Sequence, residues 1–220
     1  MRGDLSSTSR SWTVVLPVQH ADRGKTRLVG PDHLPRAELA RAIALDSIAA
    51  VLDSVAVRRV VVVTADPVVS DAVRARRVDN PDIELLADPG LGLTAAVQAG
   101  ADRALELQDD APVGVLLADV PALHGADLTA ALTAAGQHTA AVVPDCDGTG
   151  TVLLTAGPHT PLRHAFGPGS AGRHHDLGAV RLDLDLPRLR RDVDTASDLR
   201  EARSLGVGPA TSEVLAAHWR

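Results

Sequence analysis

The stretch Val113-Gly-Val-Leu-Leu-Ala-Asp-Val-Pro121 is a short apolar run that ends at a carboxylate. A run of this kind, followed at once by Asp119 and a proline, is typical of a strand that is buried on both faces of a parallel sheet. Asp119 would then lie beyond the carboxyl end of the strand, where open α/β sheets bind their ligands. The stretch therefore indicates both a fold class and the position of a site.

Similar apolar runs recur along the chain and alternate with stretches rich in Ala, Leu and Arg. This alternation predicts βαβ units in one α/β domain, with a mostly parallel sheet and helices on both faces. We expect strands at residues 13–16, 59–64, 83–87, 113–118, 140–143, 152–155 and 179–182. We expect helices at residues 35–52, 68–77, 94–108, 127–135 and 197–205.

The last of these helices carries start and stop signals. Thr195 and Asp198 are spaced like the two residues of a capping box, and Gly206 follows the last helical residue. A capping box satisfies backbone N–H groups at the first turn, and a glycine commonly ends a helix.

The composition excludes several classes of protein. A chain of 220 residues can bury one α/β core, and its formal net charge of −6 is unfavourable for general binding to nucleic acid. Aromatic residues make up 1% of the chain, which argues against stacking on single-stranded nucleic acid. The single cysteine, Cys146, cannot form an internal disulfide. It fits a reducing compartment, so we expect a cytoplasmic protein.

The chain carries no sign of a membrane segment or a second domain. None of its apolar runs approaches the ~20 residues of a membrane span. Residues 1–11 are polar and rich in serine, so we expect a disordered tail rather than a signal peptide. Without a repeat or a linker to divide the remainder, residues 12–220 are expected to form the single domain.

A basic loop follows the first expected strand. Gly24-Lys25-Thr26 resembles the end of a phosphate-binding Walker A loop, but that motif requires a glycine where Gln19 stands. Lys25 is the only lysine of the chain, and it alternates with Arg23 and Arg27. A compact ammonium acting as a point charge on a polyphosphate would account for it. The alternative is a solvated surface loop.

Three carboxylates from two distant segments are candidate metal ligands. Asp119 could hold the metal that neutralises a triphosphate, or it could belong to a turn before Pro121. Asp192 and Asp194 alternate, so in an extended segment both would point to one side and could share a cation with Asp119. Alternatively, Asp194 caps the following helix beside Thr195.

Two glycine-rich runs could bind an anion. In Asp147-Gly-Thr-Gly-Thr151 the glycines would let backbone N–H groups approach an anion, or they could form a plain turn. The run at residues 166–175 contains Ser170 and Arg173 before an expected helix start, which suggests a cradle for phosphate or carboxylate. His174 and His175 lack the cysteine and acidic partners of a zinc site. We therefore expect polar surface or substrate contacts from them.

A third glycine-containing loop precedes the third expected helix. Gly90-Leu-Gly92-Leu-Thr94 could let a nucleobase or a ribose approach the backbone. It could equally be a helix-entry turn that Thr94 caps.

Taken in order, these motifs resemble the guanylyltransferases that act on phosphoenolpyruvate or 2-phospho-L-lactate in the biosynthesis of coenzyme F420. The resemblance covers nearly the whole chain after the tail. Its matching segments are residues 24–28, 92–96, 118–123, 148–151, 166–174 and 191–195.

The resemblance implies a Rossmann-like (GT-A-like) nucleotidyltransferase fold that transfers GMP from GTP, with Mg²⁺, to a phosphorylated three-carbon acid. It implies Asp119, Asp192 and Asp194 as metal ligands, with Asp119 catalytic. The remaining implied roles are acceptor binding by Thr151, Gly167, Ser170 and Arg173, phosphate binding and catalysis by Lys25 and Arg27, and nucleotide binding by Gly92 and Thr94.

The resemblance leaves several choices open. The acceptor could be phosphoenolpyruvate, 2-phospho-L-lactate or 3-phosphoglycerate, and the protein a monomer or a homodimer. A transient contact with the downstream F420 transferase is left open as well, since a reactive phosphoanhydride product could be handed on directly. Three other interpretations compete: a molybdopterin nucleotidyltransferase, a sugar-phosphate nucleotidyltransferase and a non-catalytic nucleotide-binding module. A NAD-binding domain is disfavoured, because no Gly-x-Gly-x-x-Gly follows the first strand.

Overall fold

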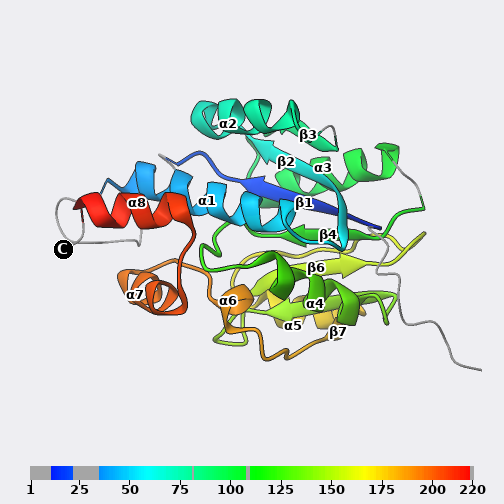
Figure 1. Cartoon of the computed structure of the whole chain (residues 1–220). Coiled ribbons are helices and arrows are strands. Elements are labelled where there is room, and N and C mark those ends of the chain that lie inside the picture. The colour runs from blue at the N-terminus through cyan, green and yellow to red at the C-terminus, as the bar shows by residue number, and fades with distance from the viewer. Residues whose placement is uncertain (1–10, 22–34, 81, 108–109, 219–220) are drawn as a thin grey trace, which may run out of the picture.

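The structure, a computed structural model, describes residues 11–21, 35–80, 82–107 and 110–218. These residues form one seven-stranded sheet in the order β3-β2-β1-β4-β6-β5-β7, covered by helices (Figure 1). The strands are β1 (Trp12–Val18), β2 (Val57–Thr64), β3 (Ile83–Ala87), β4 (Val113–Leu116), β5 (Ala140–Pro144), β6 (Thr151–Ala156) and β7 (Val180–Arg181). The helices are α1 (Arg36–Leu52), α2 (Pro67–Arg77), α3 (Leu93–Leu107), α4 (Gly125–Ala135), α5 (Ser170–Asp176), α6 (Pro187–Arg190), α7 (Ala196–Leu205) and α8 (Pro209–His218).

The seven strands and five helices that the sequence predicts are confirmed, with ends that differ by a few residues. The capping box at the start of α7 and Gly206 at its end are confirmed as well. Helices α6 and α8 were not predicted, and of α5 only the start was. Four-residue α6 is too short for a helical period, and α8 has its apolar residues on more than one side.

The sheet is mostly parallel, as predicted, and β6 is its antiparallel strand. It runs antiparallel to both β4 and β5, whereas the other paired strands are parallel. Leu116 of β4 pairs with Leu153, and the N–H of Leu117 donates to the carbonyl of Val152 at 3.2 Å. The start of β6 therefore lies beside the residues that follow β4, which include Asp119.

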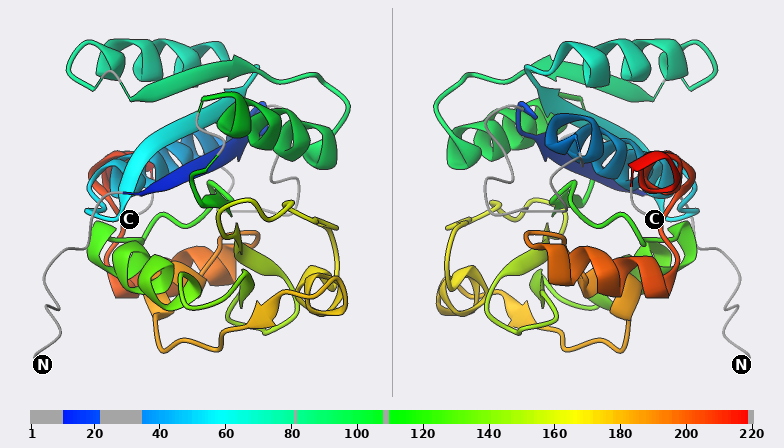
Figure 2. Two further views of the ribbon diagram at one scale, coloured as in Figure 1. Left: turned by 90° about the vertical axis from the view of Figure 1, so that its right-hand side faces the viewer. Right: turned by 90° about the vertical axis from the view of Figure 1, so that its left-hand side faces the viewer.

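Alternate residues of the central strands feed two separate apolar layers. In β1, Val14 and Leu16 pack with α1, α2 and α4, whereas Val15 packs with α3. On the α3 side, α5 packs against β5 and β6 next to Phe166. Figure 2 shows the sheet between these two helical layers. Both faces of the sheet are covered, which explains why the strands are continuous apolar runs.

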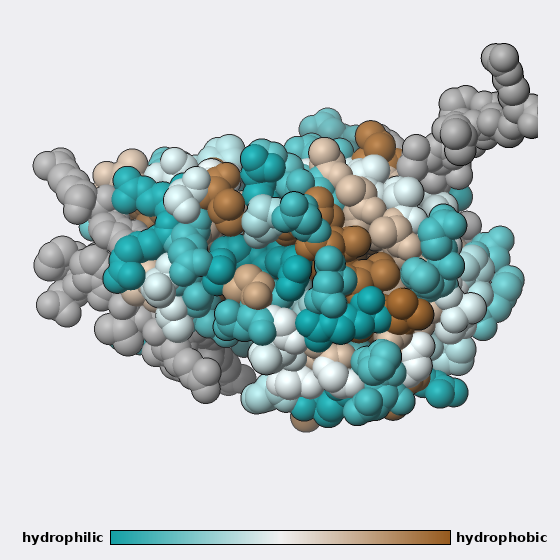
Figure 3. Space-filling model, turned by 90° about the horizontal axis from the view of Figure 1, so that it is seen from below, coloured by the Kyte–Doolittle hydropathy of each residue, from teal (hydrophilic) through white to brown (hydrophobic). Residues whose placement is uncertain are grey.

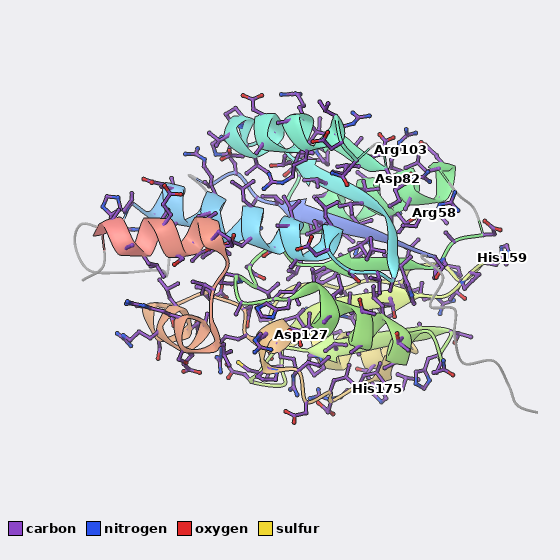
Figure 4. All side chains as sticks on the ribbon, in the orientation of Figure 1. Arg58, Asp82, Arg103, Asp127, His159 and His175 are labelled. Atoms are coloured by element: carbon purple, nitrogen blue, oxygen red, sulfur yellow. The ribbon has the colours of Figure 1, made fainter. Side chains whose placement is uncertain are left out.

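Charged side chains that form ion pairs lie at one end of the sheet, and the cavities lie at the other end. Figure 4 places Arg58, Asp82, Arg103 and His159 at the end where the parallel strands begin. There, Asp82 pairs with Arg59 at 3.6 Å, and Arg103 pairs with Glu84 at 3.6 Å. Both pairs are partly exposed and 3.6 Å long, so they add little to stability. The cavities described below lie at the opposite end, where the parallel strands finish.

The outer strand β7 protects an exposed edge of the sheet. It has two residues, and Arg181 pairs with Asp183 at 2.9 Å. A short edge strand with charged side chains discourages pairing with another chain. Leu177 and Val180 are exposed nearby, and the surface seen from below mixes apolar and polar side chains (Figure 3).

Helix α3 approaches the sheet closely, and Gly100 makes this approach possible. A Cβ at this position would overlap Cγ1 of Val15 and come within 3.0 Å of Cγ2 of Val63. Val15 and Val63 are both fully buried, so they cannot move into solvent. The glycine is therefore required by packing rather than by its backbone conformation.

We expect Gly100→Val to lower the free energy of unfolding by about 3 kcal/mol, because overpacking forces buried groups apart. The corresponding fall in Tm is about 6–12 °C, which thermal unfolding would measure. Gly172→Val is the matched control, since a Cβ at that helical glycine meets no atom within 4 Å. Equal melting temperatures for the two variants would contradict this account of α3 packing.

Candidate active site

Two adjoining cavities lie at the carboxyl ends of β1 and β4. One has a volume of about 570 Å³ and the other of about 280 Å³. Both are lined by Pro17, Val18 and Gln19, which end and follow β1, and by Leu93 of α3. Because they share these residues, the cavities adjoin, and both lie at the edge where α/β sheets bind ligands.

Asp119 and Asp194 both line the smaller cavity. Backbone contacts bring their segments together, since the N–H of Val193 donates to the carbonyl of Asp119 at 3.0 Å. The N–H of Val120 donates to Oγ of Ser47 in α1 at 3.3 Å, which fixes the turn after β4. Two carboxylates from segments more than seventy residues apart in the printed sequence thus meet at one cavity.

The third predicted carboxylate, Asp192, lies elsewhere. It is not among the described residues that line the smaller cavity, and it lies close enough to Cys146 to affect its charge state. Buried Val193 separates it from Asp194. Within the described ranges no group of three or more His, Cys, Asp or Glu residues is arranged to hold a metal ion. Asp192 as a metal ligand therefore remains a prediction.

Capping does not account for Asp194. The N-cap of α7 is Thr195, whose side chain accepts from the N–H of Asp198 at 3.3 Å. The Asp198 carboxylate accepts in return from the N–H of Thr195 at 2.7 Å. The sequence left two interpretations of Asp194 open, a helix cap and a residue of the ligand site. The structure places Asp194 at the smaller cavity, and Thr195 is the cap.

The larger cavity is lined by the loop that precedes α3. Gly90 and Gly92 have φ angles of 76° and 91°, which favour glycine, and Oδ1 of Asp88 accepts from the N–H of Gly90 at 2.8 Å. Asp88, Gly90 and Gly92 line the cavity. Thr94 lies within the first turn of α3, so it is not the cap of this helix. It is also not among the described lining residues, and its nucleotide contact remains a prediction.

Thr151 and Ser170, the predicted acceptor ligands, are in direct contact. Oγ of Ser170 donates to Oγ1 of Thr151 at 3.0 Å, and both side chains are buried. Thr151 is the first residue of β6, so the register of β4 and β6 places it near Asp119. The start of β6 thus runs beside the segment that carries Asp119, while Thr151 and Ser170 are buried and are not among the described residues that line either cavity.

His174 contacts Thr151 of this pair. It is not a surface residue, which was one of the two expectations for it. It is fully buried, its Nδ1 lies 2.9 Å from Oγ1 of Thr151, and its Nε2 accepts from the N–H of Ala165 at 2.9 Å. Burial lowers the pKa of His174 to about 4, helped by the nearby positive charge of Arg173 and by His164. The imidazole is therefore neutral at neutral pH.

The neighbouring histidine behaves as the sequence suggested. His175 is exposed, and Figure 4 places it at the lower surface of the molecule. Its Nδ1 lies 3.2 Å from the carbonyl of Ala179. Because successive helical residues point in different directions, the two histidines have different environments.

The Gly-Thr-Gly-Thr loop is a turn that is held by a carboxylate of the chain itself. Asp145 accepts from the N–H groups of Thr149 at 2.9 Å and Gly150 at 2.7 Å. The N–H of Gly148 donates to the Asp145 carbonyl at 3.1 Å. A Cβ at Gly150 would overlap the Asp145 carboxylate, so that glycine is needed for the close approach. The expectation that these N–H groups bind an anion is corrected, because Asp145 already occupies them.

Arg173 shapes the loop that leads into α5. Its Nε and Nη2 donate to the carbonyl of Ala165 at 3.0 and 2.8 Å, and its Nη1 donates to the carbonyl of Pro168. Gly167 in the same loop has a φ of 116°. The described contacts of Arg173 are thus structural, and its predicted contact with the acceptor, like that of Gly167, remains a prediction.

Asp66 contributes to the site and was not among the predicted site residues. Its carboxylate is fully buried and accepts from Nε of Arg41 at 2.9 Å, from Val68 and Val69 at the start of α2, and from the N–H of Ala21 at 3.3 Å. Burial pushes the pKa of Asp66 upward, but the hydrogen bonds from Arg41 and the backbone outweigh it, so the pKa is lowered. Because Ala21 lines the smaller cavity, Asp66 fixes part of its wall.

Other predicted groups have simpler outcomes. Lys25 and Arg27 lie outside the described residues.

Burial raises the pKa of Cys146 to about 11, with contributions from Asp147, Asp192 and Asp145, so its thiol is protonated at neutral pH and is no nucleophile. No helix in the described part of the chain is both long and apolar enough to cross a bilayer.

Comparison with known proteins gives a consistent result. The model of the family described as "Guanylyl transferase CofC like" matches residues 12–217. A phosphoenolpyruvate guanylyltransferase of Streptomyces scabiei is 45% identical over 212 residues, which cover 93% of this chain and 96% of the relative. One from Streptosporangium roseum is 42% identical, covering 94% and 91%. A solved nucleotidyl transferase from Methanothermobacter is 16% identical and superposes with a TM-score of 0.58, covering 90% of this chain and 98% of that one, which shows the same fold.

Proposed function

Because the chain belongs to the family of CofC-like guanylyl transferases, we propose that it transfers GMP from GTP to phosphoenolpyruvate and releases diphosphate. The product is enolpyruvoyl-2-diphospho-5'-guanosine, an intermediate of coenzyme F420 biosynthesis. 2-Phospho-L-lactate is the second candidate acceptor. The observation that carries the proposal is the meeting of Asp119 and Asp194 at a cavity that adjoins a larger one.

The larger cavity is assigned to the nucleoside part of GTP. Its backbone-lined loop with Gly90 and Gly92 allows a flat base and a ribose to approach closely. The Asp88 carboxylate is an acceptor at its wall, and guanine presents two donors on its N1–H and 2-amino edge. The triphosphate would then extend into the smaller cavity with Asp119 and Asp194.

A divalent metal, which nucleotidyltransferases of this kind generally use, fits the residues of the smaller cavity. Mg²⁺ prefers oxygen ligands and is usually held by one or two carboxylates together with substrate phosphates and water. Asp119 and Asp194, which line the smaller cavity, supply such a donor set. The ion, when bound, neutralises phosphate charge. We propose Mg²⁺, with Asp192 as the further predicted ligand.

The chain contributes positioning rather than a nucleophile. A phosphate of the acceptor attacks the α-phosphorus of GTP, the new P–O–P bond forms, and diphosphate leaves with the electron pair of the broken P–O bond. The attacking phosphate is already an anion, so no general base is required. Thr151 at the start of β6 and Ser170 at the start of α5, which contact each other, would orient the acceptor. Lys25 and Arg27 would neutralise the triphosphate from the loop after β1.

Diphosphate release from GTP and Mg²⁺ tests the proposal directly. Phosphoenolpyruvate, 2-phospho-L-lactate and 3-phosphoglycerate are offered separately, with the downstream F420 transferase and its deazaflavin acceptor present to consume an unstable product. We expect release with phosphoenolpyruvate. Absence of release with all three acceptors, while GTP still binds, would discard this acceptor class and favour molybdopterin or sugar-phosphate acceptors.

Other parts of the proposal concern the setting of the reaction. Both substrates are phosphorylated metabolites of the cytoplasm, which is where we place the protein. A reactive phosphoanhydride product favours transfer to the downstream enzyme during a transient contact. The protein is proposed to act as a monomer or a homodimer.

Asp88→Asn is expected to raise the KM for GTP about tenfold, because hydrogen bonds to a charged acceptor contribute more than neutral ones. The effect on ITP, which lacks the 2-amino group, is expected to be smaller. The turn would persist, since the Asn Oδ1 can still accept from Gly90. Steady-state kinetics with both nucleotides measures this, with Asp82→Asn at the far end of the sheet as control. Equal losses for GTP and ITP would contradict a contact with the 2-amino group.

A further inference from the structure

The hydrogen bonds around His174 fix the position of its proton. Its Nε2 accepts from the backbone N–H of Ala165 at 2.9 Å, so Nε2 carries no hydrogen. A neutral imidazole has one N–H, which must then lie on Nδ1. Nδ1 lies 2.9 Å from Oγ1 of Thr151, so the imidazole donates to the threonine hydroxyl.

This direction determines what the Thr151 hydroxyl can do. Oγ1 of Thr151 also accepts from Oγ of Ser170 at 3.0 Å. A hydroxyl has two lone pairs and one hydrogen, and these two bonds use both lone pairs. Thr151 can therefore form a further bond only as a donor. Phosphate and carboxylate groups only accept hydrogen bonds, so this hydroxyl is matched to an anion.

We propose that His174 is a positioning residue that commits the Thr151 hydroxyl to donating toward the anionic group of the acceptor substrate. This inference rests on the proposed function, in which Thr151 binds the acceptor. His174 itself does not contact the substrate, since its two ring nitrogens are occupied by Ala165 and Thr151.

The surroundings of His174 hold the ring in this orientation. The side chain is fully buried, and Phe166 packs against it edge to face with ring centroids 4.9 Å apart. A ring turned over by half a rotation about χ2 would break the bond from Ala165, which lies in the same loop as Phe166. The loop and α5 thus fix the tautomer of His174. This tautomer in turn makes the Thr151 hydroxyl the acceptor of their hydrogen bond.

A purely structural role for His174 predicts a different result from a positioning role. As structural support, its bond to Ala165 and its packing would matter most, and any loss would destabilise the whole loop. As a positioning residue, its bond to Thr151 would affect the acceptor and leave GTP unaffected. Two substitutions separate the two bonds, because Asn places its amide near Nδ1 and Gln near Nε2.

His174→Gln keeps an acceptor for Ala165 and loses the donor to Thr151, and it is expected to raise the KM for phosphoenolpyruvate about fivefold. This corresponds to the loss of one hydrogen bond. His174→Asn keeps the donor and is expected to stay within about twofold of the wild type. Neither variant should change the KM for GTP by more than about twofold. In a Thr151→Val background the two variants should become equal.

Equal acceptor KM values for the Gln and Asn variants, or equal increases for acceptor and GTP, would overturn the proposal. The ¹⁵N resonances of the His174 ring give a second test that needs no turnover. We expect a protonated Nδ1 and an unprotonated Nε2, assigned by the peak that the variants lose, and a protonated Nε2 would also overturn it. Absence of wild-type turnover with every acceptor would instead count against the proposed function, while the tautomer is still decided by the ring resonances.

Discussion

Asp119→Asn is expected to lower kcat by at least about 100-fold while changing the KM for GTP by less than about threefold. The carboxylate lines the smaller cavity together with Asp194, and in the proposed reaction the charge of the transferred phosphoryl group develops there. Asn is close to Asp in shape, so packing is preserved and only the negative charge and its metal-binding capacity are lost. A charge that acts mainly in the transition state affects turnover more than ground-state binding.

Single-turnover diphosphate release at saturating Mg²⁺ measures this effect. The matched control is Asp71→Asn in α2, a carboxylate that is 77% exposed and pairs with Arg74. We expect the control to keep wild-type turnover and the wild-type Tm. Unchanged turnover of Asp119→Asn at saturating Mg²⁺ would remove Asp119 from the metal site.

Asp66→Ala is expected to lower the free energy of unfolding by about 3 kcal/mol, because removing one partner of a buried ion pair leaves the other uncompensated. Four hydrogen-bond donors lose their acceptor: Arg41, which is 25% exposed, and the N–H groups of Ala21, Val68 and Val69. The fall in Tm would be about 6–12 °C. Because Ala21 lines the smaller cavity, we also expect a higher KM for GTP.

The acid dependence of stability distinguishes the charge of Asp66 from its shape. Its pKa is lowered on folding from the ordinary value of 3.8, as the bonds from Arg41 outweigh the effect of burial. A lowered pKa stabilises the folded state above the unfolded pKa, and this stabilisation is lost as the pH falls through the folded pKa. Urea unfolding at neutral pH and on either side of pH 3.8 should show a steeper acid loss in the wild type than in Asp66→Asn. Parallel curves would contradict the assigned role of the charge.

Much of the fold could be predicted from local sequence patterns. Apolar runs such as Val113–Leu116 and the capping box at Thr195 are properties of a few neighbouring residues, and all seven strands were found in this way. The position of Asp119 after a buried strand was equally local, and it indicated the ligand-binding edge of the sheet. The family resemblance, which depended on the order of several motifs, was confirmed by the family model.

Local patterns also misled where a loop had an internal partner. The glycines at residues 148 and 150 suggested backbone N–H groups for an anion, but Asp145 fills that role within the same turn. The described bonds of Arg173 likewise go to carbonyls of its own loop, and its predicted contact with the acceptor stays a prediction. Donor groups in a sequence do not reveal which acceptors the chain will supply itself.

Local sequence patterns were sufficient for the succession of strands and helices along the chain, the end of the sheet where ligands are expected, and the residue types available there. Pairings between residues far apart became visible only in the folded chain: His174 with Thr151, Asp66 with Ala21, and Asp46 with Thr211 at the start of α8. The physical reason is that helix and strand periods arise from contacts within about four residues, whereas these bonds span 23, 45 and 165 residues. They form only after the sheet and helices have packed.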